Sequence, residues 1–303
     1  MSSRMKIIFL GTSDSVPSAM RNPSSIWFSY DGENILIDCG EGTQRQIRKA
    51  KLNPGKITKI LITHWHGDHI LGLPGLLQTM ALTGYNKHLE IYGPKGTKEY
   101  MQELFRMFVF VEKFPVKVIE VVEDGKFFDG GDFVLEAKKV YHGIPSNAYS
   151  FVKKGNLRID KSKLKKLKLQ PGKYLQKLKE GKDVVIEGKK LRAKDLTYKD
   201  DEIKVSFILD TGFNKLLAKF VEDSEILVCE SNFSSEHKEH AKDHLHLTSE
   251  QAATIAKLGN VKKLYLTHVS QRYEKDEFKI ILKEARKIFK NTYLAEDLKV
   301  VEI

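Results

Sequence analysis

The stretch Thr63-His64-Trp65-His66-Gly67-Asp68-His69 decides the fold, and it follows the apolar run 57–62, which predicts a buried strand. His64 and His66 are two residues apart, so an extended backbone points both side chains the same way. Gly67 permits a sharp turn, after which Asp68 and His69 face a second point. Imidazole and carboxylate ligands together suit zinc and similar metals. The segment therefore predicts metal binding at the carboxyl end of a strand, where α/β proteins place their sites. The alternative, a histidine-rich surface loop, does not explain that position.

Three further candidate ligands follow other predicted strands. His142 follows residues 133–140, Asp210 follows residues 203–209, and His268 follows residues 262–266. Each alone is as easily an ordinary polar residue at a strand end, but after the first cluster the ligand interpretation is better. Asp210 suits a bridging position because a carboxylate has two oxygens. Two metal ions ~3.5–4 Å apart activate water and stabilise charge on a phosphoryl group, so the pattern indicates phosphodiester hydrolysis.

Strand-rich stretches with helices between them occur in two halves of the chain. Helices are predicted at residues 42–52, 71–82, 95–111, 213–220, 249–258 and 276–290, and strands at 6–10, 26–30, 35–38, 57–62, 89–92, within 116–137, and at 148–152, 203–209, 225–229, 262–266 and 298–303. Asp31-Gly32 predicts a hairpin. This order indicates a layered α/β fold.

The composition adds broad limits. The 303 residues carry a formal net charge of +11, which favours a polyanionic partner; a solvated, lysine-rich surface is the alternative. Cys39 and Cys229 lie in apolar runs and are expected to be core thiols, as in a cytoplasmic protein. No apolar run reaches the ~20 residues that span a bilayer, so no membrane association is expected.

Residues 153–201 interrupt the pattern. Residues 153–194 contain 16 Lys or Arg and 4 Asp or Glu. A solvated loop is the usual meaning of such a charge run, but here the run divides a predicted catalytic domain. We therefore expect three parts: residues 1–152, the insertion 153–201, and residues 202–303.

Several motifs together resemble a known family. His64-x-His66-x-Asp68-His69 resembles the signature of the metallo-β-lactamase superfamily. The segments that resemble the tRNA 3′-processing endonucleases, tRNase Z, are Phe9-Leu-Gly-Thr-Ser13, Asp38-Cys-Gly-Glu-Gly-Thr-Gln-Arg-Gln46, Ile70-Leu-Gly-Leu-Pro-Gly-Leu-Leu77 and Leu266-Thr-His-Val-Ser-Gln-Arg-Tyr273. The resemblance covers nearly the whole chain. It implies the metallo-β-lactamase αβ/βα four-layer sandwich, of α/β class, with a protruding basic arm.

The resemblance also implies the ligands of two Zn²⁺ ions, although Mn²⁺ or Fe²⁺ would accept similar ligands. One ion would take His64, His66, His142 and Asp210, and the other Asp68, His69, Asp210 and His268. The family's His-Ser-Thr motif is matched by His246-Leu247-Thr248, with leucine in place of serine. His244 lies where the family more often has tyrosine, so either His244 or His246 faces the site.

The implied activity is that of a zinc-dependent endoribonuclease that removes the 3′ trailer from precursor tRNA. It would leave a 3′-hydroxyl on the tRNA and a 5′-phosphate on the trailer. We expect Asp68 to orient the attacking water and accept its proton, and His246 to donate a proton to the leaving 3′ oxygen. General acid catalysis of this kind contributes ~10²–10⁴ in rate. Glu230 or Asp243 is expected to orient His246.

The resemblance suggests RNA contacts as well. Pro171, Gly172 and Lys173 lie in a segment that resembles the family's flexible arm, which clamps the tRNA elbow. Arg21 and Asn22 resemble part of the loop near the RNA 3′ end. Arg45 and Arg272 are candidates for phosphate contact, with ordinary surface ion pairs as the alternative. The family also suggests a homodimer in which the arm of one subunit serves the other's site.

Three other functions fit parts of the pattern. A thioesterase, lactamase or arylsulfatase of the same superfamily would share the metals but has no use for a basic arm. A nucleic-acid-processing relative with a large cap domain would need a longer insertion. A non-catalytic RNA-binding protein would not need a complete ligand set. Cleavage after the discriminator base and cleavage after CCA both stay open.

Overall fold

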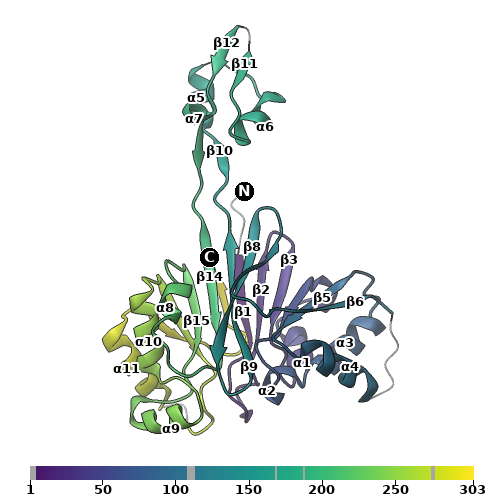
Figure 1. Ribbon diagram of the computed structural model, residues 1–303, viewed down its shortest axis with the longest axis vertical. Helices are drawn as coiled ribbons and strands as arrows, with labels where there is room; N and C mark the ends of the chain where they lie inside the picture. Colours follow the sequence, from purple (N-terminus) through teal and green to yellow (C-terminus); the bar gives the residue numbers. More distant parts are fainter. Residues whose placement is uncertain (1–4, 108–112, 168, 187, 274–276) are drawn as a thin grey trace.

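Two β-sheets lie face to face in the computed structural model, and helices cover the outer face of each (Figure 1). The structure describes residues 5–107, 113–167, 169–186, 188–273 and 277–303. In spatial order the first sheet contains β18 (Val300–Glu302), β1 (Met5–Gly11), β2 (Ser25–Tyr30), β3 (Glu33–Ile37), β4 (Lys59–Leu61), β5 (Leu89–Gly93) and β6 (Val116–Glu120). The second contains β17 (Thr292–Leu294), β16 (Lys263–Thr267), β15 (Ile226–Glu230), β14 (Ile203–Ile208), β9 (Pro145–Lys153), β8 (Phe133–Tyr141) and β7 (Gly125–Asp129).

Alternation along the strands builds the core. In β1, Ile7 and Phe9 face the core between the sheets, whereas Ile8 and Leu10 face the helices outside. This is the period of two that a strand imposes on its side chains. Phe28 and Phe151 meet between the sheets with ring centroids 4.7 Å apart. A strand buried on both faces therefore reads as a continuous apolar run.

The outer layers are helical. The helices on the side of the first sheet are α1 (Thr43–Lys49), the short α2 (Gly67–Ile70), α3 (Leu73–Leu82) and α4 (Thr97–Met107), with the 3₁₀ turn η1 (Pro54–Lys56). Those on the side of the second are α8 (Leu217–Phe220), α9 (Lys238–Asp243), α10 (Ser249–Leu258) and α11 (Phe278–Ile288), with η2 (Ser235–His237). Thr248 and Gln251 form a capping box that starts α10. The predicted four-layer αβ/βα sandwich is confirmed.

Parallel pairing brings the loops of the site to one edge. Strands β3, β4 and β5 run parallel to one another, as do β14, β15 and β16. Their carboxyl ends therefore share an edge in each sheet. Asp38 follows β3 and His268 follows β16, both with a left-handed φ, of 57° and 55°. Such backbone is concentrated at functional sites.

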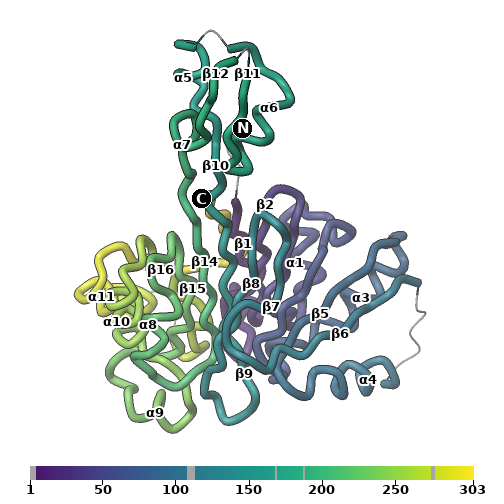
Figure 2. Tube along the Cα trace, turned by 45° about the horizontal axis from the view of Figure 1, so that its top comes forward, coloured from purple at the N-terminus to yellow at the C-terminus, as the bar shows by residue number. Residues whose placement is uncertain are grey.

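Residues 154–202, which we call the arm, project from the body between β9 and β14 (Figures 1 and 2). Within it β10 (Leu157–Ile159) pairs with β13 (Thr197–Lys199), and β11 (Val184–Ile186) pairs with β12 (Lys189–Leu191). Its helices are α5 (Lys161–Lys166), α6 (Tyr174–Lys179) and α7 (Ala193–Leu196). A separate cluster forms its core: Leu164, Leu178, Val184, Leu191, Ala193 and Leu196. The lysine-rich sequence did not predict these regular elements.

Other elements differ in detail from the sequence prediction. The Asp31-Gly32 hairpin is present, with φ of 43° and 93°. The helix predicted at 213–220 begins only at Leu217. The Asn214 side chain accepts a hydrogen bond from the Leu216 N–H at 2.9 Å, in competition with the helical pattern. Residues 108–111 of a predicted helix, residue 276 of another, and residues 168 and 187 of the insertion lie outside the described residues.

Candidate metal centre and active site

Three histidine nitrogens converge in the first of two ligand clusters. His66 Nδ1 lies 3.1 Å from His64 Nε2 and 3.2 Å from His142 Nε2. The fourth member is Asp210, whose Oδ2 is 3.6 Å from the Nε2 of both His64 and His142. His64 and His142 are buried, whereas His66 is exposed, so the cluster opens to solvent on one side.

The second cluster lies beside the first and shares Asp210. Asp68 Oδ2 is 3.1 Å from His69 Nε2 and 3.2 Å from His268 Nε2. Asp210 Oδ2 lies 3.5 Å from His69 Nε2, and its Oδ1 lies 3.3 Å from His268 Nε2. All seven predicted ligands are thus brought together, from the ends of separate strands.

These residues fit metal ions. Ligand atoms about 3.3 Å apart are what a tetrahedral ion with ~2.0–2.1 Å bonds requires. Asp210 Oδ1 is buried and has no hydrogen-bond partner among the described residues. A buried carboxylate oxygen of this kind indicates a bound ion or water as its partner. The donor set, imidazole with carboxylate, therefore forms a divalent metal centre.

The protonation preferences of the clusters agree with this interpretation. Burial lowers the pKa of His64 well below its ordinary value, which leaves a neutral imidazole with a free lone pair. For His69, burial favours the neutral ring, but Asp210, Asp68 and Asp38 raise its pKa well above the ordinary value. The second cluster thus has an excess of negative charge, which a bound cation would compensate.

Asp38 orients His69 from behind. Its Oδ2 lies 2.7 Å from His69 Nδ1, and its two oxygens accept hydrogen bonds from the N–H and hydroxyl of Thr63, each at 2.7 Å. A carboxylate behind a ligating histidine fixes the ring and makes the nitrogen more basic. The sequence interpretation gave Asp38 no such role. Its position directly after a strand, like that of the predicted ligands, was the signal that could have indicated it.

Two further ligands have orienting partners. His142 Nδ1 lies 3.0 Å from the Leu245 carbonyl, so it donates there and leaves Nε2 free for a metal. The Asn232 amide lies 3.2 Å from His268 Nδ1. Hydrogen bonds from Val269 N to Thr12 O and from Ser270 N to Asn232 O hold the left-handed turn at His268.

His246 is the histidine that faces the site. Its Nδ1 is 3.2 Å from both oxygens of the fully buried Glu230, and its ring centroid is 4.8 Å from that of His142. Leu245 has a φ of 56°, and this turn leaves His244 exposed beside His240. Burial lowers the pKa of His246, but Glu230 and Asp210 outweigh it and raise the pKa to about 9.

Comparison with known proteins identifies the family of this chain. Residues 20–152 match the model of the metallo-β-lactamase superfamily. A curated ribonuclease Z of Bacillus cereus is 40% identical over 97% of this chain and 98% of its own length, and one of Bacillus mycoides is 41% identical over the same shares. This chain belongs to the ribonuclease Z family.

Solved structures agree with membership of the ribonuclease Z family. The crystal structure of human tRNase Z, short form, is 29% identical with a TM-score of 0.72, covering 98% of each chain. A long-form RNase Z from yeast has 17% identity and a TM-score of 0.66, covers 99% of this chain and 42% of its own, and shows the fold alone. Within the described ranges, no helix has the length and apolar character needed to cross a bilayer.

The remaining residues that the ribonuclease Z resemblance suggested divide into two groups. Arg21 is only 7% exposed, and its Nη1 donates to Thr12 Oγ1 and the Ala295 carbonyl at 2.7 and 2.9 Å. It therefore points into the protein, and a direct contact of this side chain with RNA is not supported. Asn22 is half-buried and donates from Nδ2 to the Glu41 carbonyl. The exposed candidates are Arg45, Arg272, Pro171, Gly172 and Lys173.

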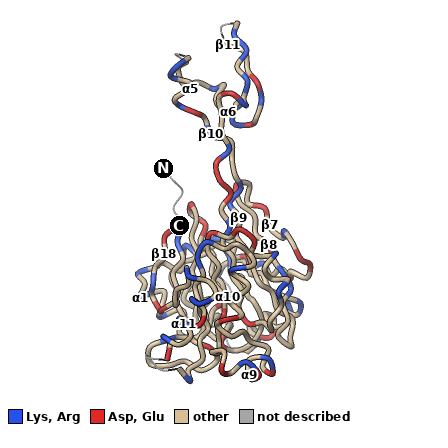
Figure 3. The backbone as a smooth tube through the Cα atoms, turned by 90° about the vertical axis from the view of Figure 1, so that its left-hand side faces the viewer, with Lys and Arg blue, Asp and Glu red and all other residues tan. Residues whose placement is uncertain are grey.

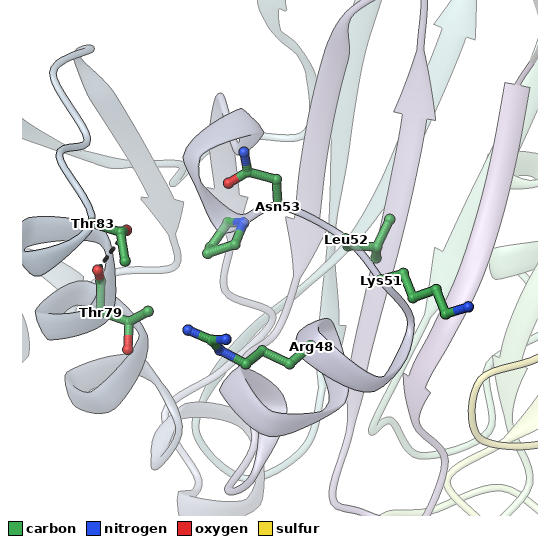
Figure 4. A pocket seen from close by; sticks show the side chains of 7 residues that line it. Arg48, Lys51, Leu52, Asn53, Thr79 and Thr83 are labelled. Atoms are coloured by element: carbon green, nitrogen blue, oxygen red, sulfur yellow. Dashed lines mark hydrogen bonds between the residues drawn. The ribbon is translucent and has the colours of Figure 1, made fainter.

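A separate hollow in this ribonuclease Z family member lies between α1 and α3 (Figure 4). Its lining residues are Arg48, Lys51, Leu52, Asn53, Pro54, Thr79 and Thr83. None of them belongs to the two ligand clusters, so the hollow is not part of the metal centre.

Proposed function

We propose that this chain is the endoribonuclease that removes the 3′ trailer from precursor tRNA with two Zn²⁺ ions per subunit. The observation that carries the proposal is the pair of ligand clusters sharing Asp210, in a chain of the ribonuclease Z family. The products would be tRNA with a 3′-hydroxyl and a trailer with a 5′-phosphate. Precursor tRNA is the proposed substrate because relatives at this identity are named ribonuclease Z.

The proposed ligand sets follow the clusters. His64, His66, His142 and Asp210 would hold one ion, and Asp68, His69, Asp210 and His268 the other. When bound, the two ions would activate water and stabilise the charge on the phosphoryl group. Zinc suits this nitrogen and oxygen donor set.

The chain's own residues supply the proton transfers. Asp68 orients the attacking water and accepts its proton. His246 donates a proton to the leaving 3′ oxygen, because its Nδ1 faces Glu230 at 3.2 Å and no described residue forms a hydrogen bond with its Nε2. Glu230 is held in turn by the Thr211 N–H at 2.8 Å. This pair keeps His246 protonated and aimed before RNA binds.

The arm is proposed as the RNA-binding part. We propose the division into residues 1–152, 153–201 and 202–303, with the middle part gripping tRNA away from the metals. Lys and Arg mark much of the arm in Figure 3, and its cations are largely exposed. Counterion release favours such a surface against an RNA backbone. Pro171, Gly172 and Lys173 lie exposed at the start of α6 and would touch RNA there.

The deciding experiment is cleavage of an end-labelled precursor tRNA, mapped to the nucleotide, with and without a chelator. Cleavage at the 3′ end of the mature tRNA, lost with chelator and restored by Zn²⁺, is expected. Mapping also decides between cuts after the discriminator and after CCA. Faster turnover of a thioester or sulfate ester than of RNA would instead favour another hydrolase of the superfamily.

We also propose a cytoplasmic homodimer. Cys39 and Cys229 are buried and unbridged, as expected in a reducing compartment. If the arm of one subunit serves the other's site, a mixture of arm-deleted chains and Asp210→Ala chains will cleave precursor tRNA although neither does so alone. If light scattering shows that the mixed chains are dimeric but precursor tRNA is still not cleaved, the arm of one subunit does not serve the site of the other.

A further inference from the structure

An arginine and His246, the proposed general acid, both pack against the same aromatic ring, Phe233. The guanidinium of Arg272 stacks on the Phe233 ring at 4.8 Å from its centroid. The same ring lies 6.1 Å from the ring of His246. Phe233 is buried, so one immobile aromatic ring supports both the proposed general acid and an arginine.

Two further contacts fix the plane of the guanidinium. Arg272 Nε donates to Ser270 Oγ at 3.3 Å, and Nη2 donates to His240 Nε2 at 3.3 Å. The His240 ring lies edge-on to the Phe233 ring, with centroids 5.0 Å apart, and its centroid is 4.2 Å from that of His244. Among the described residues, no hydrogen bond engages Nη1 or the second N–H of Nη2, so both can bind a ligand. This is the donor arrangement that binds a phosphate through two parallel hydrogen bonds.

Arg272 is exposed, and within the described part of the chain it has no carboxylate in ion-pair distance. Three other exposed arginines do have such a neighbour: Arg106 pairs with Glu103, Arg158 with Asp200 and Arg192 with Asp195. An arginine that is stacked and oriented, and that no described carboxylate neutralises, is prepared for an anion from outside the chain.

We propose that Arg272 binds the RNA phosphate on the 5′ side of the nucleotide whose 3′ oxygen leaves. The inference rests on the proposed function, in which His246 protonates that oxygen. The tRNA nucleotide that carries the oxygen must lie on the His246 side of the scissile phosphate. Its own 5′-phosphate is the next anion along the chain, and Arg272 shares the Phe233 ring with His246. His240 and Phe233 act as positioning residues.

This phosphate contact restrains the last tRNA nucleotide from both ends. The metal centre would hold the scissile phosphate and Arg272 the preceding one, so the sugar between them presents its 3′ oxygen to His246. A bidentate guanidinium contact to phosphate is a charge-assisted pair, and losing one costs about tenfold in affinity.

The test combines Arg272→Met with a precursor tRNA that carries a single neutral methylphosphonate in place of that phosphate. In the wild type the methylphosphonate should lower kcat/KM about tenfold. Arg272→Met should lower kcat/KM on unmodified RNA by a similar factor, chiefly through KM, and should then be insensitive to the methylphosphonate. Arg272→Lys keeps the positive charge but not the paired N–H donors of the guanidinium, so its kcat/KM should lie between those of the wild type and Arg272→Met. Arg106→Met, an exposed arginine on α4, serves as the control variant.

Each outcome supports the inference or overturns it. If Arg272→Met loses a further factor of ten on the methylphosphonate RNA, the contact lies elsewhere. If Arg272→Met cleaves unmodified RNA as the wild type does, no phosphate is bound there. A methylphosphonate one nucleotide farther along the tRNA should still affect the variant and the wild type equally. Failure of the wild type to cut any precursor tRNA would instead contradict the proposed function.

Discussion

The metal clusters and the arm use charge in opposite ways. In the clusters, His64, His69, His142, Asp210 and His268 are buried, and each charge faces a partner of opposite sign or a ring nitrogen. In the arm, the described lysines are largely exposed and the core consists of one small cluster. Chemistry on a phosphate requires ligands fixed by second contacts such as Asp38 behind His69. Binding an RNA backbone requires only a cationic surface of the right shape, which a thin, protruding element provides.

The largest effect is expected from a substitution in the metal clusters. Asp210→Ala removes the only residue shared by both clusters, so both ions should be lost. Activity on precursor tRNA and on a small aryl phosphodiester should fall by more than about 10⁴-fold, beyond the contribution of a general acid alone. Metal analysis and both assays check this. Asp223→Ala, a carboxylate on the outer surface, is the control; full metal content in Asp210→Ala would contradict the shared-ligand assignment.

Removing the arm should abolish the function of one region and leave that of the other unchanged. Deletion of residues 160–195 leaves the strands of both sheets intact, so metal content and hydrolysis of the aryl phosphodiester should be retained. Cleavage of precursor tRNA should fall by roughly 10³-fold, the scale of losing several phosphate contacts. The measurement is the ratio of the two activities. If precursor tRNA is still cut normally, the arm is not the RNA-binding part.

His246→Ala should act on chemistry alone. Metal content should stay intact while kcat falls by ~10²–10⁴. The pKa of His246 is raised to about 9, so the proton it donates is present below that pH and lost above it. Bound cations would repel the imidazolium, and the alkaline limb of kcat is therefore expected at or below pH 9. That limb should vanish in the variant, and a pH–rate profile of both proteins checks it.

Sequence reasoning selected the residues that make up the two clusters because they follow strands. The cluster from His64 to His69 is local, and the carboxyl ends of parallel strands meet at one edge, which gathers Asp210 and His268. Asp38 was missed because its contact with His69 depends on a left-handed backbone that no pattern of apolar residues encodes.

The errors arose where a side chain has two possible environments. Arg21 lies in a polar loop, and its sequence neighbours do not tell whether it points outward or toward the Ala295 carbonyl. The arm's strands and helices escaped prediction because a few apolar residues, Leu178 among them, are spread over many lysines. Periodicity is weak when a core is that small.

Asp38→Asn should have an intermediate effect on the metal side. The amide keeps a hydrogen-bond acceptor for Thr63 but loses the charge that orients His69 at 2.7 Å. Metal affinity or activity should fall 10–100-fold, as is typical when such an outer partner is replaced. Titration with a competing chelator measures the affinity, and a variant that binds metal as tightly as the wild type would remove Asp38 from the centre.

The smallest expected effect concerns the base of the arm, where residues 154–156 and 200–202 connect it to the body. The Asp200 carboxylate accepts hydrogen bonds there from the Asn156 N–H, from Arg158 Nε at 2.8 Å and from Lys153 Nζ at 3.2 Å. Lys153 is buried and also donates to the Asp201 carbonyl. One carboxylate thus ties the last residue of β9 to both sides of the arm's base.

Asp200→Ala should raise KM for precursor tRNA about threefold to fivefold, the scale of exposed ion pairs, without a change in hydrolysis of the aryl phosphodiester. The physical reason is orientation: an arm that points in many directions must lose that freedom when RNA binds. Asp124→Ala is the matched control, because Asp124 also accepts from a lysine, Lys138, and from a backbone N–H but lies away from the arm. Equal KM values for Asp200→Ala and the wild type would mean that the two strands leading into the arm suffice to direct it, and that the body and arm are coupled through backbone pairing alone.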